Sequence, residues 1–161
     1  MAERSYKLLD AVHRLPGHDE LGELKAEYLA KWVATVRRLC AELGRAKVGD
    51  TSIGRLLSAA PIGKDGVWPC EPARDVMEDV RSEEIIHGAH TGVYNLPGVH
   101  WRGEGGDQER DLAEKYRKWG EALQVSHPFV SSKLLMGLAA TYDHEASRED
   151  MAAGIRRRMR Q

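Results

Sequence analysis

Apolar residues recur every three or four positions along most of this chain, and this spacing limits the fold more than any other feature of the sequence. The clearest run joins seven large side chains: Leu21, Leu24, Tyr28, Trp32, Val36, Leu39 and Leu43. Because a helical turn takes ~3.6 residues, such steps place these side chains on one helix face. Leu29, Val33 and Cys40 widen that face, so we expect this helix to contact more than one neighbour. Gly44 fits its C-terminal end.

The same spacing predicts helices along the rest of the chain, with glycine and proline between them. Their expected ranges are 2–15, 51–60, 72–80, 83–94, 107–123 and 128–161. Asp50 or Thr51 is expected to cap the second of these helices, and Ser82 the fourth, because short polar side chains bind the free backbone N–H groups of a helix start. Pro72 suits the first turn of the third. In the last range, residues 147–150 resemble a helix start and predict a kink or restart.

No segment alternates between apolar and polar residues with the period of two that a half-buried strand would show. The sequence therefore predicts an all-α protein of about six to eight helices, packed as antiparallel hairpins, with a long C-terminal helix. The 161 residues fit one domain, and no linker of biased composition divides residues 1–161.

Composition narrows the classes of function. The chain is 42% hydrophobic and 30% charged, which is typical of a globular protein. Its formal net charge of −1 gives no overall attraction to nucleic acid or to an anionic membrane. No apolar run approaches the ~18 residues of a membrane-spanning helix, and the N-terminus carries charges where a signal peptide needs an apolar core. We therefore expect a cytoplasmic protein.

The two cysteines differ in their surroundings. Cys40 falls on the apolar stripe of residues 21–43, which favours a buried thiol in the core. Cys70 lies between Pro69 and Pro72, in a stretch that we interpret as a loop, and is expected to be the more accessible thiol.

Residues 87–106 have the most unusual composition of the chain. Three histidines, Tyr94, Trp101 and six glycines fall within these 20 residues. Binding residues tend to lie in such irregular segments between rigid helices. Together with the loop that holds Trp68, this segment is our predicted protein-binding surface. Its candidate residues are Trp68, Tyr94, His100, Trp101 and Arg102. In the alternative interpretation, the two loop tryptophans close the end of a helical bundle.

The residue types also allow two alternative kinds of site, a metal site and a surface that contacts nucleic acid. Glu84, His87, His90 and His100 form the candidate set of metal ligands, because Glu-x-x-His spacing directs both side chains of a helix toward one ion. A metal-dependent enzyme of this kind would need further carboxylates, and the nearest counterpart, Asp10-x-x-His13, is incomplete.

The C-terminus offers the second alternative, contact with nucleic acid. Its candidate residues are Arg156, Arg157, Arg158 and Arg160. Cations at the end of a helix are also favoured by the helix dipole alone.

From Trp68 to the end, the order of the residues resembles a known kind of bacterial segment. The resemblance lies in WP…ARDVMEDV, SEE…G…TGVYN, GV…RGEGGDQERDLAEKYRKWGEAL and LAATYDHEASRED. It is to helical segments at the C-termini of large uncharacterised bacterial proteins, and LKAEYLAKWVATVRRLCAELGR fits it loosely. The resemblance implies an end piece of a longer polypeptide, and it carries no activity. We therefore expect a non-enzymatic module without a cofactor. Its expected partner is another protein or another domain of a larger assembly, rather than nucleic acid or a membrane.

Overall fold

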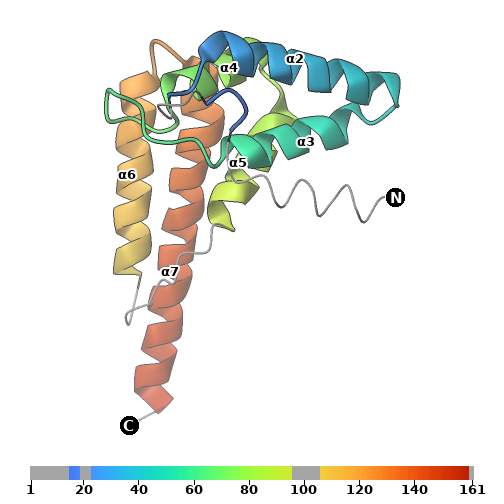
Figure 1. Ribbon diagram of the computed structural model, residues 1–161. Helices are drawn as coiled ribbons and strands as arrows, with labels where there is room; N and C mark the ends of the chain where they lie inside the picture. Colours follow the sequence, from blue (N-terminus) through green and yellow to red (C-terminus); the bar gives the residue numbers. More distant parts are fainter. Residues whose placement is uncertain (1–14, 19–22, 96–105, 160–161) are drawn as a thin grey trace. The chain divides into compact units, whose positions relative to one another are not determined.

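A computed structural model describes residues 15–18, 23–95 and 106–159 of the chain, without the side chain of Arg157. Over these residues the protein is all-α, which confirms the predicted fold class (Figure 1). The described part forms six α-helices and one π-helical segment, and it contains no strand, only an isolated bridge between His18 and Leu24. The helix predicted at 2–15 falls almost wholly outside the described residues.

The chain divides into two compact units, Met1–Leu96 and Pro97–Gln161. The boundary falls at Asn95-Leu96-Pro97-Gly98, which the sequence suggested only as a helix end. The organisation of the chain as one domain stays a prediction. Each unit is described by itself below.

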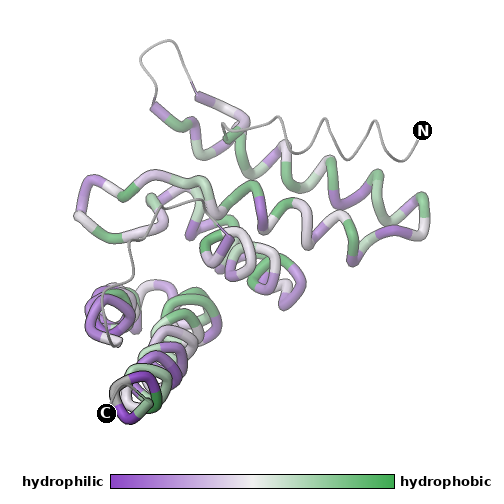
Figure 2. Tube along the Cα trace, turned by 90° about the horizontal axis from the view of Figure 1, so that it is seen from below, coloured by the Kyte–Doolittle hydropathy of each residue, from purple (hydrophilic) through white to green (hydrophobic). Residues whose placement is uncertain are grey.

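The first unit contains α2 (Ala26–Glu42), α3 (Ala46–Leu57), α4 (Glu71–Val80) and α5 (Glu83–Tyr94). Helix α3 has its most extensive contacts with α5, while α2 lies against α3 and α4 (Figure 1). Apolar residues recur among polar ones along each of these helices (Figure 2). The largest fully buried side chains of this unit are Leu29, Val33, Ile53, Leu57, Pro69, Met77 and Ile85.

Glycines allow α3 and α5 to approach very closely. A Cβ atom on Gly88 of α5 would lie 2.9 Å from the carbonyl carbon of Thr51 and 3.1 Å from the backbone nitrogen of Arg55, both on α3. A Cβ atom on Gly54 of α3 would in turn lie 2.8 Å from the backbone nitrogen of Ala89. These contacts are with backbone atoms, which cannot move aside as a flexible side chain can. The two helices therefore require glycine where they cross.

The second unit is a helical hairpin. Helix α6 (Asp107–Leu123) runs beside α7 (Met136–Met159), and a π-helical segment, Val130–Leu135, leads into α7 (Figure 1). The ring of Tyr116 stacks on that of Tyr142, with 5.6 Å between centroids, and meets Trp119 edge-on at 5.5 Å. Ser131 donates a hydrogen bond of 2.7 Å to the carbonyl oxygen of Gly120, which ties the π-helical segment to α6.

Helix α7 is continuous through residues 147–150, so the predicted restart of the helix is wrong. The hydroxyl of Ser147 donates to the carbonyl oxygen of Asp143, 3.0 Å away, instead of capping a new helix. Asp150 does bind a free backbone N–H group, but that group belongs to Gly106, at the start of α6. The polar residues that resembled a local helix start thus have other partners in the folded hairpin.

Some helix starts were predicted correctly and others were not. Pro72 lies in the first turn of α4, and Ser82 caps α5 by accepting a hydrogen bond from the backbone nitrogen of Ile85 at 3.3 Å, both as expected. Helix α3, however, begins at Ala46, so Asp50 and Thr51 lie inside it and cap nothing. Helix α2 likewise begins later than its apolar stripe, at Ala26.

Candidate protein-binding surface

The structure gives Trp68 a role inside the first unit. Only 7% of this residue is exposed, and its ring nitrogen donates a hydrogen bond of 2.8 Å to the carbonyl oxygen of Ala60. A buried tryptophan with a satisfied N–H group stabilises the fold. Trp68 therefore offers no exposed ring to a partner, and the prediction that it anchors one needs correction.

Of the other residues in the predicted protein-binding set, Tyr94 is exposed at the end of α5. His100, Trp101 and Arg102 lie outside the described residues. Among the described members of this set, only Tyr94 is exposed.

The candidate metal ligands are spread along α5. Glu84 forms an ion pair with Lys47 of α3 at 3.4 Å, His87 is exposed, and His90 is half-buried. His100 is not among the residues that the structure describes. Within the described ranges, no three His, Cys, Asp or Glu side chains are grouped so that they could hold a metal ion.

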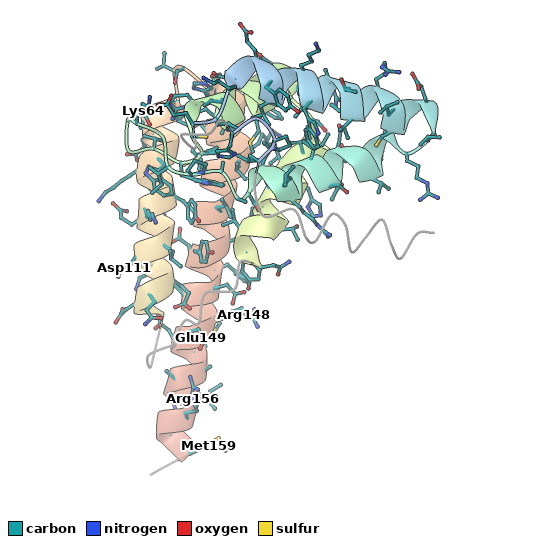
Figure 3. The ribbon with its side chains drawn as sticks, viewed as in Figure 1. Lys64, Asp111, Arg148, Glu149, Arg156 and Met159 are labelled. Atoms are coloured by element: carbon teal, nitrogen blue, oxygen red, sulfur yellow. The ribbon has the colours of Figure 1, made fainter. Side chains whose placement is uncertain are left out.

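Of the C-terminal arginines, Arg156 lies near the end of α7, between Glu149 and Met159 (Figure 3). Arg156 lies 3.8 Å from Glu149, and Arg158 is exposed. The side chain of Arg157 and all of Arg160 are outside the described part of the chain. The arginine whose contacts are known thus has an acidic neighbour on its own helix.

An open apolar face on α2 is the feature of the first unit that most resembles a binding surface. Tyr28 is 57% exposed, Leu39 46% and Leu43, at the C-cap, 79%, while Trp32 is half-buried between them. At about 100° per residue, these four side chains fall within an arc of about 60°. We call them the α2 face.

The buried side of α2 lies next to this face. Leu29 and Val33 are 0% and 1% exposed, and they lie about 100° and 140° around the helix from Tyr28. The apolar arc of α2 is therefore wider than its contact with α3 and α4. The sequence predicted that this helix contacts more than one neighbour, and its contacts with both α3 and α4 confirm this.

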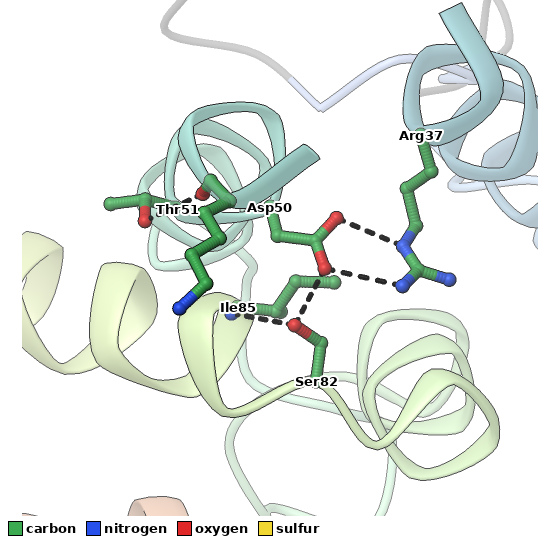
Figure 4. A network of polar contacts seen from close by, with 6 residues as sticks. Arg37, Asp50, Thr51, Ser82 and Ile85 are labelled. Carbon is green, nitrogen blue, oxygen red and sulfur yellow. Dashed lines mark hydrogen bonds and ion pairs between the residues drawn. The ribbon is translucent and has the colours of Figure 1, made fainter. Parts of the chain in front are cut away.

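A polar network holds α2 in position relative to α3 and α5. Arg37 of α2 binds Asp50 of α3 through two hydrogen bonds, of 2.9 and 3.2 Å, and the hydroxyl of Ser82 donates to the same carboxylate at 2.6 Å (Figure 4). Ser82 also caps α5. One buried carboxylate therefore joins three helices and fixes the orientation in which α2 presents its open face.

A second carboxylate organises the loop before α4. Asp65 pairs with Arg74, whose side chain is 6% exposed, and the other carboxylate oxygen of Asp65 accepts a hydrogen bond from the backbone nitrogen of Val67. The hydrogen bond from Arg74 holds the pKa of Asp65 below its usual value. Two nitrogens of Arg74, Nε and Nη1, are buried without a hydrogen-bond partner. The loop therefore folds around the Arg74 guanidinium but provides hydrogen-bond acceptors for only part of it.

The two thiols are arranged opposite to expectation. Cys70 is buried, its backbone nitrogen donates to the carbonyl oxygen of Pro61 at 2.9 Å, and burial raises the pKa of its thiol. Cys40 is half-buried beside Gly49 at the α2–α3 contact. Proline-rich sequence around Cys70 suggested an exposed loop, but the loop folds back on the first unit.

The end of α7 carries a smaller apolar stripe. Met151, Ile155 and Met159 are exposed and follow one another at steps of four residues. This stripe spans about two turns of helix. The α2 face is longer and includes two aromatic side chains, so it is the stronger candidate.

Comparison with protein-family models, with curated proteins and with solved structures found no match to this chain. Among the helices that the structure describes, none has the length and apolar content needed to cross a membrane.

Proposed function

We propose that this chain is a non-enzymatic helical module that binds another polypeptide through the α2 face. The observation that carries the proposal is the division of α2 into a buried side, with Leu29 and Val33, and an open apolar side, with Tyr28, Leu39 and Leu43. Large exposed apolar patches on folded domains commonly mark interaction sites.

The chemistry of the α2 face favours a polypeptide as the ligand. Its four side chains form one row along α2, and such a row can pack against the apolar side of a second amphipathic helix. Trp and Tyr side chains supply large contact areas and are enriched among residues that dominate binding energy. The flank of the stripe carries both signs of charge, on Lys31, Arg38 and Glu42, so it gives no general attraction to a polyanion.

We also propose a cytoplasmic setting and an origin as the end piece of a longer bacterial protein. Both cysteines are free, which agrees with a reducing compartment. The resemblance of residues 68–161 to the ends of large bacterial proteins supports the second part. In such a polypeptide, the α2 face would bind another domain or another protein.

A capture experiment tests the proposal. The wild-type chain, a Leu39→Glu/Leu43→Glu double variant and a Val125→Glu control are immobilised, and polypeptides bound from a lysate of producing cells are identified by mass spectrometry. Val125 is 94% exposed in the turn after α6, so its replacement matches the change in polarity at a surface site outside the α2 face.

We expect wild type and the Val125→Glu control to retain the same polypeptide, and the double variant to lose it. Circular dichroism must show that the double variant keeps its helices, which is expected because both side chains are exposed. Equal capture by all three proteins, or no capture by wild type, would overturn the proposal.

A further inference from the structure

We propose that the polypeptide that binds the α2 face is a second copy of this chain, and that the two α2 helices pack antiparallel across a twofold axis. This inference rests on the proposed function of the α2 face and specifies its partner. It is carried by two observations, the order of side-chain sizes along the face and the order of charges along its flank.

The α2 face is complementary to its own reverse. In an antiparallel pair centred between residues 35 and 36, Tyr28 of one copy lies opposite Leu43 of the other, and Trp32 lies opposite Leu39. Each aromatic ring thus meets an aliphatic side chain, and the same contacts form on both sides of the twofold axis. Self-complementary contacts of this kind are the rule in twofold dimers. The face is about 22 Å long, at ~1.5 Å rise per residue, which gives several turns of contact.

The charges on the flank select the antiparallel direction. Lys31 and Glu42 lie about 20° apart on the same side of the α2 face. In the antiparallel pair, Lys31 of one copy comes within about 3 Å, along the helix axis, of Glu42 of the other. This pairing occurs twice because of the twofold axis. In a parallel twofold pair, by contrast, this flank of one copy would lie on the opposite side of the interface from the same flank of the other copy, so Lys31 and Glu42 would not meet.

The flank is accessible for such contacts. Glu42 accepts a hydrogen bond from Arg38 through Oε1 at 2.6 Å, and the side chains of Glu42 and Arg38 are 56% and 61% exposed. Lys31 is exposed as well. An exposed carboxylate can bind a second cation without losing the first, so the intramolecular pair is compatible with the contact between copies.

Sedimentation velocity over a range of concentrations tests the inference on the full chain. We expect wild type to pass from monomer to dimer as concentration rises, and Leu39→Glu/Leu43→Glu to stay monomeric. Lys31→Glu and Glu42→Lys should each weaken dimerisation by about tenfold, because two exposed pairs change from attraction to repulsion. The combined variant Lys31→Glu/Glu42→Lys should return to within about threefold of wild type, since it restores opposite charges across the interface.

Failure of this inference can be told apart from failure of the proposed function. Wild type that is monomeric at every concentration would overturn the dimer, while loss of a different captured polypeptide in Leu39→Glu/Leu43→Glu would leave the proposed function intact. A dimer in which the combined charge variant is as weak as the single ones would overturn the antiparallel arrangement. Circular dichroism of each variant checks that its helices are formed.

Discussion

Replacing Gly88 with alanine should destabilise the first unit, although alanine is the better helix former. The added Cβ atom would lie 2.9 Å from the carbonyl carbon of Thr51 and 3.1 Å from the backbone nitrogen of Arg55. Ordinary contact of such atoms begins near 3.4 Å. Helix α3 would therefore have to move away from α5, the helix with which it makes its most extensive contacts.

The size of the effect follows from two opposed contributions. Overpacking a tight contact costs about 1–3 kcal/mol, and the upper end applies because the atoms that are crowded belong to the backbone. Glycine to alanine inside a helix gains ~1 kcal/mol. The net loss in the free energy of unfolding is therefore about 2 kcal/mol. For a unit of this size, that corresponds to a fall in Tm of roughly 8–16 °C.

Thermal and urea unfolding followed by circular dichroism measure the effect, and hydrogen exchange at the amides of α3 and α5 locates it in the first unit. Gly154→Ala is the matched control. A Cβ atom there has no neighbour within 4 Å, so this variant should gain up to ~1 kcal/mol from helix propensity alone. If Gly88→Ala were as stable as wild type, the argument from the close approach of the helices would be refuted.

Three further predictions concern the polar groups of the first unit. Asp50→Ala should lower the free energy of unfolding by about 2–3 kcal/mol in urea, because the three hydrogen bonds to its carboxylate are lost together; a loss below about 0.5 kcal/mol would contradict this. Cys70 should react with iodoacetamide far more slowly in the folded protein than in urea, because burial raises the pKa of its thiol; equal rates would count against this. The pKa of Asp65 is lowered by the hydrogen bond from Arg74, so its contribution to stability is present above pH ~3.9 and is lost as the pH falls through the lower pKa of the folded state. Arg74→Met should remove this acid-dependent part when unfolding is compared between neutral and acidic pH, and an unchanged pH profile would contradict the assignment.

Local signals were sufficient for much of the fold. The spacing of apolar residues predicted the all-α class, and Pro72 and Ser82 predicted the first turn of α4 and the start of α5, because each acts through atoms a few residues away. Asp50 shows where such signals fail. Its residue type favours a helix cap, but its partners are Arg37, 13 residues before it, and Ser82, 32 residues after it. A local pattern contains no information about those partners.

The candidate binding surface was harder to predict than the fold, because tertiary packing decides which of its side chains are exposed. The loop around Trp68 allowed two interpretations, a ring exposed to a partner or a ring that closes the end of the bundle. The ring is buried and hydrogen-bonded to Ala60, which agrees with the second. The apolar stripe of α2 was evident from the sequence, but which half of it would stay open depends on where α3 and α4 pack. The width of the stripe predicted more than one neighbouring helix, which α3 and α4 supply, but it did not indicate which part would stay exposed.

Photo-crosslinking from the α2 face in living cells is the most direct test of the central claim. A photoreactive phenylalanine analogue is placed at Leu43, 79% exposed at the end of α2, and at Val125 as the control. We predict a discrete covalent adduct to one polypeptide from position 43, and its loss when Leu39→Glu is added. No adduct from position 43, or the same adducts from position 125, would contradict the account.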